Sequence, residues 1–142
     1  MKNKLFLVML LGLGHFANAS IKCVNEVNED SDAYIAVTID QSKSDQIEIR
    51  QYASSFVVVQ EFINVQNLMD DAGTFIGTKY KAESADISFS EEGNHYNDKI
   101  SFDLDLNQTN REASFSLSNF DKSENKFVIV LEKVKLTCRT SN

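Results

Sequence analysis

The chain has 142 residues, of which 42% are hydrophobic and 25% charged, and it contains no proline, no tryptophan and only two cysteines. These proportions are typical of one ordinary folded domain, and they exclude collagen-like, low-complexity and disulfide-dense classes. With ten phenylalanines the chain is too apolar to be a disordered tail.

The first nineteen residues have the pattern of a secretory signal peptide. Lys2 and Lys4 give a charged start, residues 5–13 form a short apolar run, and residues 17–19 place small side chains around a cleavage site. The run is much shorter than the roughly 20 residues that a membrane-spanning helix needs. We therefore predict a signal peptide at residues 1–19, a periplasmic or secreted protein of bacterial type, and no membrane span.

Removal of the signal leaves a single β-domain at residues 20–142. The signal contains two lysines and no acidic residue. The remaining chain therefore has 12 basic and 21 acidic side chains, a net charge of −9. Nucleic acids bind clustered lysine and arginine, so this charge argues against them as partners. Long-range attraction favours cationic partners instead, although acidic surfaces also serve solubility alone.

The two cysteines lie close to the two ends of the predicted domain. Cys23 is the fourth residue after the cleavage site, and Cys138 is four residues from the last position. In an oxidising compartment we expect them to form a disulfide. Such a bond brings their Cα atoms within about 7 Å, so the first and last strands must be neighbours in one sheet or face each other across the core.

Alternation of apolar and polar residues, which is typical of strands with one buried and one wet face, recurs along the chain. The clearest case is residues 100–107, with Ile, Phe and Leu on one face and Ser, Asp and Asn on the other. In chain order, the pattern predicts strands at residues 34–40, 47–50, 87–90, 100–107, 114–118 and 127–138. Turn-forming Asn, Asp and Ser separate them at residues 28–32, 42–45, 91–94, 107–110 and 119–125.

The last predicted strand has two parts. Residues 127–131 are apolar on both faces, which predicts that this part enters a buried centre, and Val134, Leu136 and Cys138 then alternate with polar residues. Glu132 falls on the apolar phase of the alternation. We expect a β-bulge there that turns its carboxylate outward.

Residues 56–73 fit two interpretations. Three valines at 57–59, followed by more β-branched and aromatic residues, favour a strand as far as about Val65, with a turn or a single helical turn at residues 67–71. The same segment also fits an amphipathic helix that ends at Gly73 as its C-terminal cap. The density of β-branched residues favours the strand.

Eight or nine short strands without crossover helices predict an all-β fold, either an antiparallel β-sandwich or a small β-barrel. The alternative is an α+β fold with one helix near residues 56–72. A domain of this size buries enough surface to hold its core without a metal ion.

Few residues are available for catalysis. His95 is the only histidine after the signal, which excludes multi-histidine zinc sites and makes any Ser-His-Asp triad depend on one turn residue. Asp103 and Asp105 lie on one strand face about 7 Å apart by strand rise, a spacing that overlaps that of two-carboxylate glycosidases. Any alternating strand with two aspartates has that spacing, so we predict no catalytic residue.

Oxygen-rich segments suggest calcium as a candidate ligand. Residues 40–45 place oxygen-bearing side chains at alternating positions, as an EF-hand loop does, but the glycine at its sixth position and the glutamate at its twelfth are missing. Residues 28–32, Asp70 and Asp71 are also rich in oxygen ligands. We nevertheless predict no metal site and no cofactor.

A glycosylation sequon at residues 107–109 matters only in a eukaryotic host.

These observations favour a non-enzymatic exported domain that binds a protein or a small molecule, or that has a structural role in the cell envelope. One alternative is an inhibitor of a cationic hydrolase such as a lysozyme, because an acidic surface attracts such an enzyme. Another is a hydrolase that uses two close carboxylates. Tyr34, Tyr52 and Tyr96 are predicted to point outward, but scattered surface tyrosines do not predict a site.

Overall fold

The computed structural model describes residues 19–43 and 46–141, so the predicted signal peptide lies outside the described residues except for Ala19. The described chain forms nine strands and two single-turn 3₁₀ helices. Their bounds are β1 Ser20–Val24, β2 Ile35–Asp40, η1 Gln41–Lys43, β3 Gln46–Gln51, β4 Ser54–Val58, η2 Gln60–Phe62, β5 Asn64–Met69, β6 Phe75–Glu91, β7 Asn94–Asn107, β8 Glu112–Asp121 and β9 Lys126–Ser141. None of the described helices is long and apolar enough to cross a membrane.

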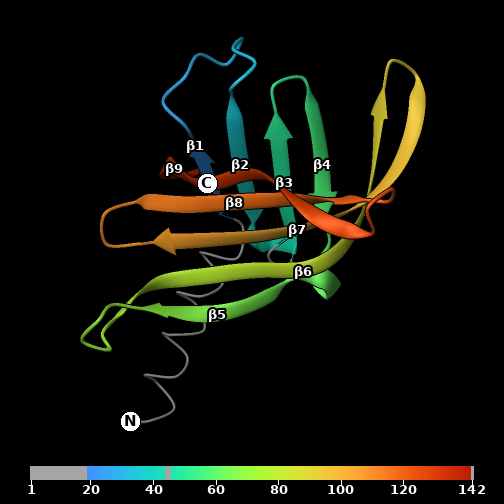
Figure 1. Cartoon of the computed structure of the whole chain (residues 1–142). Coiled ribbons are helices and arrows are strands. Elements are labelled where there is room, and N and C mark those ends of the chain that lie inside the picture. The colour runs from blue at the N-terminus through green and yellow to red at the C-terminus, as the bar shows by residue number, and fades with distance from the viewer. Residues whose placement is uncertain (1–18, 44–45, 142) are drawn as a thin grey trace.

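All nine strands belong to one antiparallel sheet with the order β4-β3-β2-β1-β9-β8-β7-β6-β5. The sheet consists of two meanders, β1 to β4 and β5 to β9, which join where the first strand pairs with the last. In Figure 1 the strands of the second meander run across those of the first, so the sheet folds over into two layers. β4 and η2 pack against β6, but β4 does not pair with β5 and the sheet is not closed into a barrel.

The core lies between the two layers and follows the alternation in the sequence. On β7, Ile100, Phe102, Leu104 and Leu106 are buried while the intervening polar residues are half exposed. The largest fully buried side chains come from both meanders: Val37, Ile39, Ile47, Ile49 and Val58, with Ile100, Phe102, Leu104, Phe115, Leu117 and Leu136. Among the described residues no polar or charged residue is buried, so the core is held by apolar packing.

The predicted disulfide is present and joins the two meanders. Cys23 of β1 and Cys138 of β9 are directly opposite in the antiparallel register, with Cα atoms 4.0 Å apart. The Cys138 amide donates to the Arg111 carbonyl, 2.8 Å away on the opposite side of β9. The cysteines therefore form a non-hydrogen-bonded pair, the arrangement in which facing Cα atoms come closest. The first and last strands are neighbours in one sheet, as the disulfide argument predicts.

The prediction for residues 56–73 is confirmed in part: strands form here as favoured, with different bounds, and the alternative amphipathic helix is wrong. The valine run does not continue as one strand to Val65, because β4 ends at Val58 and the single turn η2 separates it from β5. Residues 67–69, predicted as a turn, belong to β5, which pairs with β6 and turns back through Asp70 to Thr74. No amphipathic helix forms here; the chain instead uses η2 to cross from one layer to the other.

The bulge predicted at Glu132 is confirmed. Phe115 faces Val134 on β9 but Leu117 faces Leu131, so β9 carries one extra residue between these pairs. Lys133 adopts a positive φ of 47° at this point, and its amide donates to the Ser116 hydroxyl at 2.9 Å. Glu132 is exposed. The bulge thus resolves the conflict between a charged residue and the apolar phase of the strand.

Candidate functional site

His95 does not belong to a triad in the described structure. It lies at the start of β7, beside the tip of the β6–β7 hairpin, directly opposite Ser90 of β6. The Ser90 hydroxyl and the His95 Nδ1 atom are 2.9 Å apart, and both residues are exposed. A serine and a histidine in this position form an ordinary cross-strand polar pair on a solvated hairpin.

Asp103 and Asp105 each face a lysine across the strand pair. Lys81 of β6 is opposite Asp103, and Lys79 is opposite Asp105, whose Oδ1 atom is 3.9 Å from the Lys79 ammonium. These residues line the outer face of β7, and the carboxylates are half exposed. Opposite charges across a strand pair stabilise the sheet, so this arrangement accounts for both aspartates without a catalytic role.

The oxygen-rich segments that suggested calcium stabilise turns instead. Asp70 accepts hydrogen bonds from the amides of Ala72 and Thr74, at 3.0 and 2.8 Å, and so fixes the turn between β5 and β6. Asn107 does the same for Thr109 in the turn after β7. Part of the 40–45 segment lies outside the described residues. Within the described ranges no three His, Cys, Asp or Glu side chains gather as metal ligands would.

Two half-buried aspartates have a lowered pKa because they also hold turns. The hydroxyl of Ser42 donates to Asp40, and this hydrogen bond is the main cause that lowers the pKa of the Asp40 carboxyl. Ser123 lowers the pKa of Asp121 in the same way, helped by its own backbone amide. A carboxyl that acts as a general acid near neutral pH needs a raised pKa, so these shifts fit turn formation.

Of the three tyrosines predicted to point outward, one does not. Tyr34 is buried, and the guanidinium of Arg50 lies 5.1 Å from the centre of its ring, a cation–π contact that the strand alternation alone does not predict. Tyr52 and Tyr96 are exposed. Tyr96 stacks on Phe89 of the neighbouring strand, with ring centres 5.3 Å apart.

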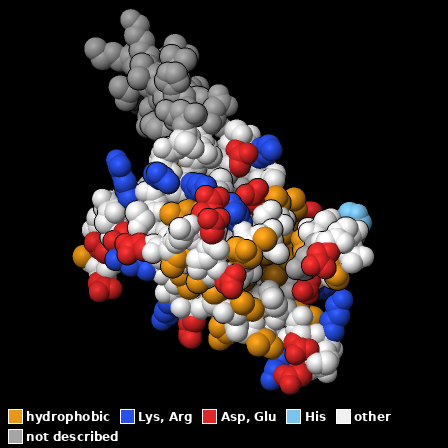
Figure 2. Space-filling model, turned by 90° about the horizontal axis from the view of Figure 1, so that it is seen from above, with side chains coloured by type: hydrophobic (Ala, Val, Ile, Leu, Met, Phe, Trp, Pro, Cys, Tyr) orange, Lys and Arg blue, Asp and Glu red, His pale blue; other side chains and the backbone are white. Residues whose placement is uncertain are grey.

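The most unusual exposed surface lies on β9. Phe127, Val128, Ile129 and Val130 are four consecutive large apolar residues, all exposed, and 64% of the Ile129 surface is accessible. This corrects the prediction that the start of the last strand enters a buried centre. Figure 2 shows that hydrophobic side chains gather in the middle of one face of the molecule, with charged side chains around them. We call residues 127–130 the apolar segment of β9.

Along the apolar segment β9 also has one open edge, because β9 is far longer than β1. β1 pairs only with residues 137–141 of β9, whereas β8 pairs with β9 from Lys126 to Thr137. On the side away from β8, residues 126–136 have no strand neighbour within the described part of the chain. Because the amides of a strand alternate between its two sides, this open edge presents hydrogen-bonding groups as well as apolar side chains.

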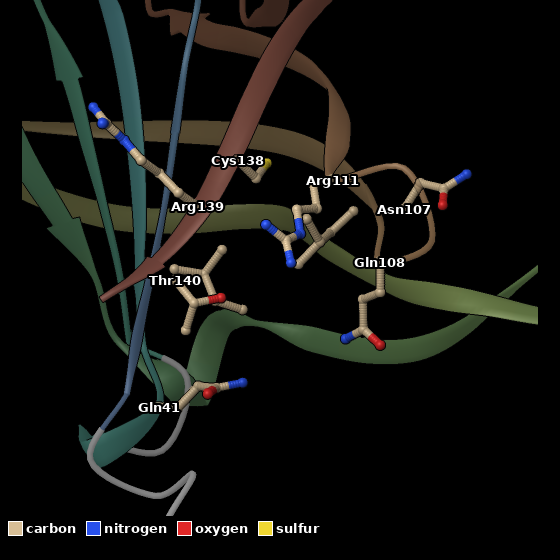
Figure 3. A pocket seen from close by; sticks show the side chains of 9 residues that line it. Gln41, Asn107, Gln108, Arg111, Cys138, Arg139 and Thr140 are labelled. Atoms are coloured by element: carbon tan, nitrogen blue, oxygen red, sulfur yellow. The ribbon is translucent and has the colours of Figure 1, made fainter. Parts of the chain in front are cut away.

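A pocket of about 530 Å³ lies beside the disulfide, at one end of the space between the two layers. Its lining comes from β1, β7, β9, η1 and the β7–β8 turn: Ile21, Gln41, Leu106, Asn107, Gln108, Arg111, Cys138, Arg139 and Thr140. In Figure 3 the Arg111 side chain extends into the space between β9 and the β7–β8 turn, while the guanidinium of Arg139 points away from it. The size is typical of small-ligand pockets.

Sequence reasoning identified neither surface. Arg111 has no recognisable motif around it and reaches the pocket through a left-handed backbone conformation with a φ of 57°. The apolar segment was noticed but assigned to the core. No local pattern in the sequence distinguishes either surface, because both depend on which segments lie nearby in the fold. Comparisons with protein-family models, curated proteins and solved structures gave no match.

Proposed function

We propose that the protein is a non-enzymatic, exported binding domain, and that it binds a protein partner along the open edge of β9. The observation that carries this proposal is the exposure of Phe127 to Val130 on a strand edge without a neighbour. Long exposed apolar edges promote aggregation, so natural proteins usually shorten, charge or cover them. An edge that stays apolar over four residues is best explained by a partner that covers it.

The edge determines the kind of segment that fits it. Unpaired backbone groups require an extended chain that adds a strand to the sheet. Val128 and Ile129 pair with successive residues of β8 and so point to opposite faces, which means that the partner strand needs apolar side chains on both of its faces. The net charge of −9 expected for residues 20–142 attracts a basic protein from a distance. We therefore expect the partner to be a basic protein that offers an exposed apolar strand or tail.

The experiment compares three versions of the purified protein as bait in an extract of the compartment to which it is exported. Ile129→Lys places a charge in the middle of the apolar segment, a substitution that blocks strand addition in natural sheets. Because Ile129 is already largely exposed, this variant should fold normally. Tyr52→Lys adds the same charge at an exposed turn outside β9 and serves as the matched control.

The bound protein is then identified, purified and titrated against all three versions. We expect a basic partner whose affinity falls at least tenfold with Ile129→Lys, changes less than twofold with Tyr52→Lys and weakens with added salt. Hydrogen exchange of the amides of residues 126–131 should slow in the complex, because strand addition protects backbone groups. Equal binding by Ile129→Lys, unchanged exchange, or occupation of the edge by a second copy in sedimentation experiments would refute the proposal.

A further inference from the structure

The pocket beside the disulfide is an open end of the core. Its floor is formed by Leu106 and Cys138, both buried, and Ile21 and Thr140 face each other across the β1–β9 pair at its side. Apolar surface therefore continues from the core to the mouth of the pocket. A hollow between two sheet layers that has an apolar floor and a few polar groups at its rim is a common form of small-ligand site.

The charge at this pocket is opposite to that of the protein. None of its nine lining residues is an aspartate or glutamate, although acidic residues outnumber basic ones 21 to 14 in the whole chain. Arg111 takes part in none of the ion pairs found in the described residues, while its neighbour Glu112 pairs with Lys135 at 3.2 Å. The guanidinium at the pocket thus has its donors available for an anion.

The position of Arg111 is fixed by its backbone. Its carbonyl accepts the amide hydrogen of Cys138 at 2.8 Å, which ties the β7–β8 turn to β9 directly beside the disulfide. The side-chain oxygen of Asn107 accepts hydrogen bonds from Thr109 and Asn110 and so orders the rest of the turn. Because the turn is held at both ends, its backbone need not be ordered when a ligand binds at Arg111, and a preorganised segment of this kind favours binding.

We propose that this pocket binds a small amphipathic carboxylate, independently of the partner site on β9. The apolar part of the ligand packs on Leu106, Ile21 and the disulfide, and its carboxylate accepts hydrogen bonds from the Arg111 guanidinium. Arginine matches a carboxylate in geometry because its planar fork offers two parallel donors. The amides of Gln41 and Gln108 lie at the rim, where they provide further donors for the same group.

The test is a titration of the purified protein with octanoate, a linear monocarboxylate, followed by calorimetry and by amide chemical shifts. Octanol and octylammonium have the same chain with a neutral and a cationic head group. We expect saturable one-to-one binding of octanoate, with shifts centred on Gln108, Arg111 and Thr140. Binding of octanol and octylammonium should be at least tenfold weaker, since neither offers an anion to the guanidinium.

Variants separate a specific site from general adsorption to apolar surface. Arg111→Gln should weaken octanoate binding at least tenfold, and Arg111→Gly provides a second test because glycine accepts the left-handed backbone without strain. Lys22→Gln removes one positive charge from an exposed residue of β1 that does not line the pocket, and it should change the affinity less than twofold. Thr140→Trp fills the mouth of the pocket and should abolish binding.

Three results would overturn this inference: no saturable binding of octanoate, equal affinity in the Arg111 variants, or equal binding of octylammonium in the same pocket. The Ile129→Lys variant links this test to the previous one. It should bind octanoate with unchanged affinity. A failure of the proposed partner site on β9 can therefore be told apart from a failure of the proposed carboxylate pocket.

Discussion

Both ends of β9 carry large apolar residues, but their surroundings are opposite. At the C-terminal end, Leu136 and Cys138 are buried, and at Thr137 β9 passes from pairing with β8 to pairing with β1. At the N-terminal end, Val128 and Ile129 are exposed, and the strand has a neighbour on one side only. An apolar sequence therefore becomes core only where other strands and the second layer cover it.

The bulge at Glu132 and Lys133 separates these two ends. Before it, residues in both phases of the strand are exposed; after it, strict alternation returns and the inward phase is buried. Bulges bend a strand and increase its local twist. The C-terminal end of β9 thus joins the two meanders, while its N-terminal end has the open edge at which we propose that a partner binds.

Loss of the disulfide should lower the stability of the protein more than any other change considered, because the bond lies at the buried C-terminal end of β9. Replacing both cysteines by serine frees a link between residues 115 apart, for which the chain-entropy model gives about 4–5 kcal/mol of stability. We expect the melting temperature to fall by more than about 10 °C under oxidising conditions. Reduction of the unmodified protein should reproduce the fall, and identical melting curves for variant and parent would contradict it.

Side-chain truncations at the two ends of β9 should give the next largest difference in stability. Leu136→Ala removes a fully buried side chain and should cost about 2–5 kcal/mol in urea denaturation. Ile129→Ala removes a mostly exposed one and should stay within about 0.5 kcal/mol. Similar losses in the two variants would mean that the apolar segment of β9 is covered in the isolated protein.

Substitutions at the bulge should change the stability of the protein least. Lys133→Val places a β-branched side chain at a φ of 47° and should destabilise the protein by about 1 kcal/mol, whereas Lys133→Asn should be neutral because asparagine tolerates this conformation. Lys135→Val, two residues away in regular strand, is the control and should cause no loss. A neutral Lys133→Val variant would show that the bulge does not depend on this backbone conformation.

Features set by local alternation and by covalent chemistry were predictable from the sequence. The strand from Ile100 to Asn107, the pairing of Cys23 with Cys138 and the bulge at Glu132 each follow from a few neighbouring residues and simple physical rules. The number of strands followed in the same way, because turn clusters separate them.

Features that depend on distant neighbours were not predictable in this way. The end of β4 at Val58 depends on η2 crossing between the layers, and the open edge of β9 beside Ile129 depends on the length of β1. The pocket at Arg111 exists only because β1, β7 and β9 meet there. Local patterns determine which face of a strand is apolar, but they do not determine which other segment covers that face.

The pairing of the first strand with the last also limits when this protein can finish folding. β1 has β2 on one side, but its other neighbour is residues 137–141, which are the last described part of the chain to be synthesised. Contacts between such distant segments form slowly because a very large loop must close first. During synthesis the N-terminal meander therefore carries β1 with one open edge until residues 137–141 have emerged, and in this interval that edge is free to pair with other strands.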